Sequence, residues 1–269
     1  MKKVLLTFIF LFCSVASHAA ERIISLKPNI TEIIYALHAE EKLVGVTTYC
    51  NRPEAATKLP QVADYLAPSV EKVVALQPDL LLTAQENGEA APVLRLQSLG
   101  YKVAFYKFDR VQDTLSSIEA IGRDLHREKP ARELSKNLQN TLQQVQARAP
   151  TQKPRVLFLL SAQPLIAVGA NTLFSELIAI AGGENVLGKN KTHWPRLNEE
   201  NLLQLQPEII FTLYMDEQQD AALWKKFPQI FAVQQKNIYH LNPDDFRAGP
   251  NLANAASTLQ KLIYASAHP

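Results

Sequence analysis

The chain is poor in cysteine, and it has no hydrophobic run long enough to cross a membrane. It has two cysteines, Cys13 and Cys50, in 269 residues. The most apolar run, from Val4 to Phe12, falls far short of the roughly 20 residues of a transmembrane helix. Few cysteines and no spanning segment exclude a disulfide scaffold and an integral membrane protein. We therefore expect a large globular core.

The first nineteen residues have the pattern of a secretory signal peptide. Lys2 and Lys3 precede the apolar run, and Ser17-His18-Ala19 places small residues where cleavage requires them. We predict that residues 1–19 are removed, so that the mature protein lies outside the cytoplasm. Removal leaves Cys50 alone and 26 basic against 26 acidic side chains. Without a basic excess, we expect no nucleic-acid partner.

The common signatures of secreted and nucleotide-dependent enzymes are also missing. The sequence contains no Gly-x-Ser-x-Gly, His-Glu-x-x-His, Gly-x-Gly-x-x-Gly or P-loop motif. The histidines of the mature chain do not form pairs at metal-ligand spacing. One enzymatic alternative stays open, in which Asp244 and Asp245 act with His193 or His240 in a metal-dependent hydrolase.

What the sequence does contain is an alternation of short apolar runs with amphipathic stretches. This pattern predicts α/β units around mainly parallel sheets. The expected strands are residues 22–26, 43–47, 80–83, 103–106, 156–160, 209–213 and 238–241.

An internal repeat predicts two lobes of similar construction. Residues 69–83 align without gaps on residues 198–212, so that Glu71 matches Glu200 and the prolines at 78 and 207 coincide. Each copy reads as a capped helix, a proline stop and a buried strand. We therefore assign an N-terminal lobe to residues 20–112 and a C-terminal lobe to residues 151–269.

Residues 113–150 between the lobes predict a helical connection. Apolar side chains recur at three- and four-residue intervals, so residues 131–149 should form one amphipathic helix of about 28 Å. A long helix is stiff, and the expected motion between the lobes is small.

Aromatic side chains stand in the predicted loops. Tyr49 comes after residues 43–47, while Tyr65 and Trp194 each stand four residues before the helix start of their repeat copy. Loops at the carboxyl ends of strands converge in open α/β sheets, so these rings could line a cleft from both lobes. The alternative is that they only fasten their loops to the core.

Glu71 and Glu200 occupy the first turns of the two matching helices. The helix dipole explains each carboxylate singly, with a contribution of about 0.3 to 1 kcal/mol. Their symmetrical recurrence also suits a two-fold symmetric partner that presents basic residues.

Several segments together resemble the periplasmic cobalamin-binding proteins of ABC importers, the BtuF type. The resemblance rests on residues 22–26, 29–32, 43–49, 70–80, 181–185, 194–195 and 244–250. It implies a non-enzymatic periplasmic receptor, monomeric when free, that captures cobalamin between its lobes and has no other cofactor. It also implies delivery to a permease dimer, with Glu71 and Glu200 as the docking residues. The implied ligand contacts are Tyr49, Tyr65, Trp194, Asp244, Asp245, Phe246 and Arg247.

Three positions depart from that family's pattern. Tyr65 and Asp245 stand where cobalamin binders carry tryptophan, and Ala84 stands where another aromatic is expected. The same class includes binders of haem and ferric siderophores. A haem or siderophore receptor is therefore the alternative within the class.

Overall fold

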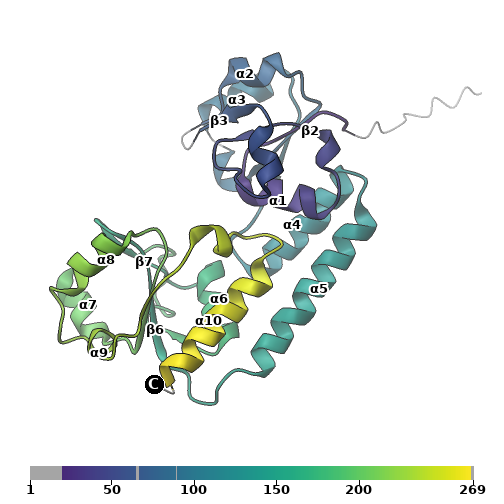
Figure 1. Cartoon of the computed structure of the whole chain (residues 1–269). Coiled ribbons are helices and arrows are strands. Elements are labelled where there is room, and N and C mark those ends of the chain that lie inside the picture. The colour runs from purple at the N-terminus through teal and green to yellow at the C-terminus, as the bar shows by residue number, and fades with distance from the viewer. Residues whose placement is uncertain (1–19, 65–66, 89, 268–269) are drawn as a thin grey trace, which may run out of the picture.

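The computed structural model describes residues 20–64, 67–88 and 90–267 (Figure 1). The predicted signal peptide, residues 1–19, lies outside the described residues, and so does Tyr65. Two α/β lobes stand on a layer of helices that runs from one lobe to the other.

The N-terminal lobe contains a five-stranded parallel sheet in the order β3-β2-β1-β4-β5. Its strands are β1 (Ile23–Ser25), β2 (Leu43–Thr47), β3 (Gln61–Ala63), β4 (Leu80–Ala84) and β5 (Val103–Tyr106). The α-helices around it are α1 (Pro28–Ala36), α2 (Val70–Ala75) and α3 (Ala91–Ser98), with short 3-10 turns at Glu40–Lys42, Glu54–Lys58 and Gln85–Asn87. Neighbouring Ile23 and Ile24 point to opposite faces of the sheet and are both fully buried, as expected for a central strand.

The C-terminal lobe is built on a sheet in the order β10-β9-β6-β7, with β8 also paired to β6. Its strands are β6 (Arg155–Ala162), β7 (Leu165–Ala167), β8 (Glu184–Asn185), β9 (Ile209–Thr212) and β10 (Ile238–His240). The helices are α6 (Leu173–Ala181), α7 (Glu199–Leu205), α8 (Glu217–Trp224), α9 (Phe231–Gln234) and α10 (Leu252–Ala267), with a 3-10 turn at Pro243–Phe246. All pairings are parallel except that of β6 with β7. The predicted α/β class with mainly parallel sheets is confirmed.

The two copies of the repeat form the same local structure in the two lobes. Ser69 and Asn198 cap α2 and α7 through their side chains, as predicted. Beyond each helix, Gln77 and Gln206 take up left-handed backbone conformations, with φ of 46° and 38°, just before the prolines that stop the helices.

The strand that follows each helix is tied to its neighbour in the same way. Asp79 accepts hydrogen bonds from the backbone N–H groups of residues 21 and 22. Glu208, at the equivalent position, accepts one from the N–H of Arg155 at 2.8 Å. The guanidinium groups of Arg22 and Arg155 in turn donate to the carbonyls of Leu76, just after α2, and of Leu205, at the end of α7. These matched residues therefore serve architecture.

The predicted long connecting helix is α5 (Glu128–Ala147), which spans about 30 Å. It is preceded by α4 (Val111–Asp124), a second connecting helix that the apolar spacing did not reveal. Gly122 allows the two to approach closely, because a Cβ at this position would lie 2.3 Å from the Cβ of Ala131. The helix begins three residues before the predicted range of 131–149 and ends two residues before the end of that range, and its buried side chains include Ala131 and Ser135.

The main hydrophobic core is continuous between the lobes. It includes Ile23 and Ile33 of the N-terminal lobe, Leu138 of α5, and Val156 and Phe158 of the C-terminal lobe. Hydrogen bonds add to this connection, since Glu176 of α6 accepts from Arg110 and from the N–H of Val111 at the start of α4. Within the described part of the chain, no helix has the length and apolar character needed to cross a membrane.

Candidate ligand-binding cleft

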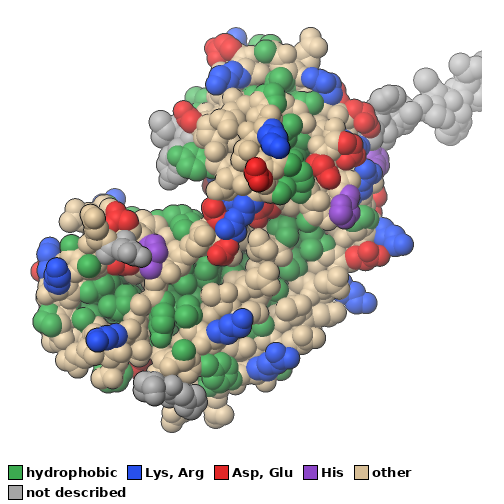
Figure 2. Space-filling view, viewed as in Figure 1, with side chains coloured by type: hydrophobic (Ala, Val, Ile, Leu, Met, Phe, Trp, Pro, Cys, Tyr) green, Lys and Arg blue, Asp and Glu red, His purple; other side chains and the backbone are tan. Residues whose placement is uncertain are grey.

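A cavity of about 740 Å³ lies between the two lobes and is lined by both. All five strands of the N-terminal sheet lead into it, because the loops that follow their carboxyl ends supply lining residues. The C-terminal lobe contributes the start of α6, the loop that carries Trp194, and the segments after β9 and β10. Figure 2 shows the corresponding hollow between the upper lobe and the lobe at the left.

Exposed aromatic residues of both lobes line the cavity. Tyr49 follows β2 in the N-terminal lobe and is 50% exposed, and Trp194 of the C-terminal lobe is 46% exposed. Trp194 also packs edge-on against Phe174, which stacks on Phe158 of the core. Trp194 therefore fits both interpretations: its ring contacts a ring packed on the core, and the residue lines the cavity.

The loop that carries Trp194 is fixed by backbone contacts. Its carbonyls at His193 and Pro195 accept hydrogen bonds from the N–H groups of Gly169 and Ala167. Gly169 must be glycine here, since a Cβ would lie 2.0 Å from the carbonyl oxygen of Thr192. The ring is thus presented by a rigid loop.

Not all of the ligand contacts predicted at residues 244–247 line the cavity. Asp244, Phe246 and Arg247 are lining residues. Of the predicted contacts that the structure describes, Asp245 alone lies outside the lining, and it forms an ion pair with Arg52 at 2.6 Å. Phe246 is 3% exposed and packs edge-on against Phe158, so its ring belongs mainly to the core.

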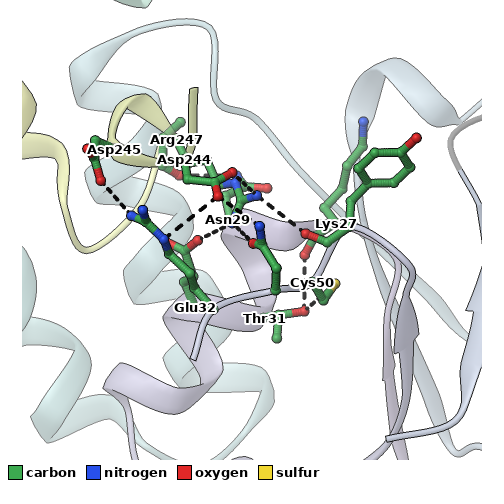
Figure 3. A network of polar contacts seen from close by, with 12 residues as sticks. Lys27, Asn29, Thr31, Glu32, Cys50, Asp244, Asp245 and Arg247 are labelled. Atoms are coloured by element: carbon green, nitrogen blue, oxygen red, sulfur yellow. Dashed lines mark hydrogen bonds and ion pairs between the residues drawn. The ribbon is translucent and has the colours of Figure 1, made fainter. Parts of the chain in front are cut away.

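Arg247 is the centre of a polar network that joins the lobes (Figure 3). Its guanidinium donates to Glu32 Oε1 at 2.6 Å, to Asn51 Oδ1 at 2.8 Å and to the carbonyl of Tyr49 at 3.3 Å. It also pairs with Asp244 of its own segment at 2.5 Å. Since Glu32, Tyr49 and Asn51 belong to the N-terminal lobe, Arg247 ties the base of the cleft together and holds the Tyr49 loop.

The Glu32 carboxyl lies at the buried end of this network. Its side chain is 7% exposed, and Oε2 has no hydrogen-bond partner. Burial raises the pKa of Glu32, while the hydrogen bond and charge of Arg247 oppose that rise. The ion pair with Arg247 therefore favours the charged form of this carboxyl, against the effect of burial.

Cys50 lies beneath the Tyr49 loop as a buried thiol. Its Sγ contacts the hydroxyl groups of Thr31 and Thr47 at 3.1 and 3.2 Å. At 1% exposure it fills space in the core beside the network.

Of the residues named for a hydrolase, Asp244 and His193 line the cavity, whereas Asp245 and His240 are not among its lining residues. Asp244 and Asp245 are ion-paired with arginines, whereas His240 contacts Asp220 and Thr212, both at 3.2 Å, in the C-terminal lobe. Across the described ranges, no group of three His, Cys, Asp or Glu side chains is placed to hold a metal ion.

Glu71 and Glu200 lie outside the cleft on exposed first turns of α2 and α7. These helices are at the outer parts of the two lobes (Figure 1). Glu71 accepts a hydrogen bond from Ser69 Oγ at 3.0 Å, and its pKa is lowered by its own backbone N–H and by that hydroxyl. Glu200 accepts from Gln204 at 3.3 Å.

Sequence reasoning missed three aromatic lining residues, Tyr214, Phe108 and Phe174. Tyr214 is 63% exposed and comes two residues after β9. In the repeat, the end of β9 aligns with the end of β4. Tyr49 was predicted because it closely follows a strand, and the same criterion would have indicated Tyr214.

Two similar α/β lobes, a helical connection and an aromatic cleft between them define a solute receptor of the class with a rigid helical backbone. The chain matches the family model described as periplasmic binding protein over residues 23–244, and it belongs to that family.

Known relatives share nearly the whole chain. A vitamin B12-binding protein of Yersinia pestis is 30% identical over 247 residues, which cover 90% of this chain and 86% of the relative. The crystal structure of the periplasmic vitamin B12 binding protein BtuF of Vibrio cholerae is similar with a TM-score of 0.81 at 27% identity, covering 93% of this chain and 99% of that one. The periplasmic haem-binding protein HutB of Vibrio cholerae gives a TM-score of 0.81 at 28% identity, covering 90% and 98%. These relatives are binding proteins.

Proposed function

We propose that this chain is a periplasmic receptor that binds cobalamin between its lobes and delivers it to the permease of an ABC importer. The observation that carries the proposal is the interlobe cavity with exposed rings on both sides, Tyr49 from one lobe and Trp194 from the other. A large, flat macrocycle offers apolar faces to such rings, and each aromatic contact adds about 0.5 to 1.5 kcal/mol beyond the buried area. The name of the Yersinia relative supports cobalamin as the macrocycle.

The way the lobes are joined supports capture with little reorganisation. A core that continues through α5, and the network around Arg247, hold the two walls of the cleft at a set spacing. A preformed cleft avoids part of the free-energy cost of ordering on binding. Delivery then requires a partner that either moves the lobes apart or removes the ligand from between them.

Glu71 and Glu200 are the residues we assign to permease docking. Both are exposed at equivalent places of the two lobes, and neither takes part in the interlobe network. Exposed ion pairs contribute about 0 to 1 kcal/mol each, so they would set orientation while the rest of the interface supplies affinity. Residues 1–19 would direct the chain to the periplasm and be removed.

Calorimetry on residues 20–269 tests the ligand. We expect saturable binding of cyanocobalamin at one site per chain and an increase in Tm. Haemin provides the second arm, because the haem-binding protein of Vibrio cholerae has the same fold. A Soret band that appears on mixing with haemin and is lost in Tyr49→Phe, with no heat from cyanocobalamin, would replace cobalamin by haem as the ligand.

A further inference from the structure

Two arginine–glutamate pairs cross between the lobes, and the internal repeat relates them to each other. A second, four-residue match in the sequence aligns Glu32 of α1 with Glu176 of α6. Glu32 accepts a hydrogen bond from Arg247 of the C-terminal lobe, and Glu176 accepts one from Arg110 of the N-terminal lobe, both at 2.6 Å. Each arginine comes after the last strand of its own lobe, β10 or β5. Each lobe therefore supplies one arginine to the other lobe and one glutamate that receives the other's arginine.

The two pairs differ in burial. The side chains of Arg247 and Glu32, the buried pair, are 15% and 7% exposed (Figure 3). Those of Arg110 and Glu176, the exposed pair, are 52% and 24% exposed. Separating a buried ion pair is far more costly than separating an exposed one, which water and salt screen. A movement of the lobes away from each other should therefore break the exposed pair first.

The exposed pair lies directly beside the cleft. Phe108, two residues before Arg110, lines the cavity, and so does Phe174, two residues before Glu176. Neither member of the pair is itself among the described lining residues. Glu176 also accepts a hydrogen bond at 2.8 Å from the N–H of Val111, the first residue of α4. The pair therefore fastens the two walls of the cleft to each other without offering a surface to the ligand.

We propose that the exposed pair is a latch that opens when the lobes separate to admit or release the ligand, while the buried pair stays formed as the pivot. This inference rests on the proposed function and makes Arg110 and Glu176 positioning residues for ligand exchange. The latch is closed both in the free receptor and around a bound ligand. Weakening it therefore lowers the barriers to entry and to exit alike and leaves the affinity unchanged.

Stopped-flow kinetics of cyanocobalamin binding to Arg110→Gln test the latch. The association and dissociation rate constants should both rise by about two- to fivefold, the range open to an exposed ion pair, while the Kd stays within about twofold. The control is Arg127→Gln, which removes an arginine paired with Glu41 at 2.8 Å outside the described cavity lining, and it should change neither rate. For the wild type, 0.5 M NaCl should raise both rates, because salt screens exposed charges.

Hydrogen exchange measured by NMR tests the latch without any ligand. The N–H of Val111 donates across the lobes to Glu176, so its exchange with water reports their separation. The N–H of Thr114 is the internal control, because it donates to the Arg110 carbonyl within α4 at 3.0 Å. In Arg110→Gln, after correction for the intrinsic rate beside the new side chain, exchange of Val111 should be about two- to fivefold faster and that of Thr114 unchanged.

Unchanged rate constants in Arg110→Gln would overturn the inference while leaving cobalamin binding intact. So would a faster dissociation matched by an equal loss of affinity, because Arg110 would then act on the ligand itself. Equal acceleration of Val111 and Thr114 would also overturn it, since α4 would be fraying without a separation of the lobes. If the wild type bound no corrinoid, the proposed function would fail and hydrogen exchange would decide the latch: faster exchange of Val111 alone supports it, and unchanged exchange overturns it.

Discussion

Removal of Arg247 tests the interlobe network at its centre. In Arg247→Ala, Glu32 loses its principal partner, and the Tyr49 loop loses two hydrogen bonds, at the Tyr49 carbonyl and at Asn51. Asp244 keeps Asn51 at 2.7 Å and the more distant Arg52 at 3.8 Å. The main consequence is therefore an unpaired carboxylate at Glu32.

The expected loss of folding stability in Arg247→Ala follows from the burial of Arg247 and Glu32. The Arg247 and Glu32 side chains are 15% and 7% exposed, so solvent screens their interaction weakly. Breaking a buried ion pair by removing one partner costs about 3 to 5 kcal/mol. We expect about 3 kcal/mol at pH 8, which corresponds to a fall in Tm of about 6 to 12 °C for a chain of this size.

The loss of folding stability in Arg247→Ala should become smaller as the pH falls. Burial already raises the pKa of Glu32, and removal of Arg247 removes the main opposing influence, so the pKa in the variant rises further. A carboxyl whose pKa is raised by folding binds its proton more tightly in the folded state. Its folded form is therefore stabilised as pH falls through that pKa and loses this stabilisation as pH rises, by at most about 1.4 kcal/mol per pH unit. The deficit of Arg247→Ala should shrink from pH 8 towards pH 5.

Urea unfolding at pH 5, 6.5 and 8 measures this deficit. The double variant E32Q/R247A should recover about 1 to 2 kcal/mol of it at pH 8, because no carboxylate then remains buried without a partner. Arg132→Ala, at an exposed arginine on α5, serves as the control and should change stability by less than about 0.5 kcal/mol. A deficit that is the same at pH 5 and pH 8, together with a further loss in E32Q/R247A, would refute the reasoning.

Three further predictions concern separate parts of the molecule. Trp194→Ala should weaken cyanocobalamin binding about tenfold in calorimetry, whereas Phe231→Ala, at an exposed ring outside the cavity, should leave the Kd unchanged. Replacing Glu71 and Glu200 together by arginine should abolish receptor-dependent cobalamin uptake by cells while the Kd for cyanocobalamin is kept; an equal loss of affinity would instead place these acids in the cleft or the fold. Ser69→Ala should destabilise the protein by about 1 kcal/mol in urea unfolding, because Lys72 N–H loses its side-chain acceptor.

The fold could be predicted where local pattern and tertiary structure agree. Strands β2 and β5 have the predicted bounds, and β4, β9 and β10 differ from the prediction by one residue at one end. Buried parallel strands are continuous apolar runs, so burial leaves a direct trace in the sequence. Strands β3, β7 and β8 were missed because they are two or three residues long and are fixed by pairing with neighbours rather than by their own composition.

The site could be predicted where position in the chain relative to a strand or a repeated helix decides it. Tyr49 was found by its place after a strand and Trp194 by its place before the repeated helix, and both line the cleft. The arrangement around Arg247 was not found, because its partner Glu32 is 215 residues away and nothing local in either segment marks the pair. The resemblance implied that Arg247 contacts the ligand, whereas the structure gives it a second role between the lobes.

The repeat explains why architecture was easier to predict than recognition. Each lobe must end a helix, begin a buried strand and secure the neighbouring strand, and it does so with the matched residues Asp79 and Glu208. A ligand that differs at its two faces imposes no such symmetry. Accordingly the wall from the N-terminal lobe presents Tyr49 with the acids after β3 and β5, and the opposite wall presents Trp194 and Tyr214. Apart from Glu71 and Glu200, which we assign to docking, the residues that the two copies share therefore indicate the frame. The choice of ligand should be altered first at lining residues where the copies differ.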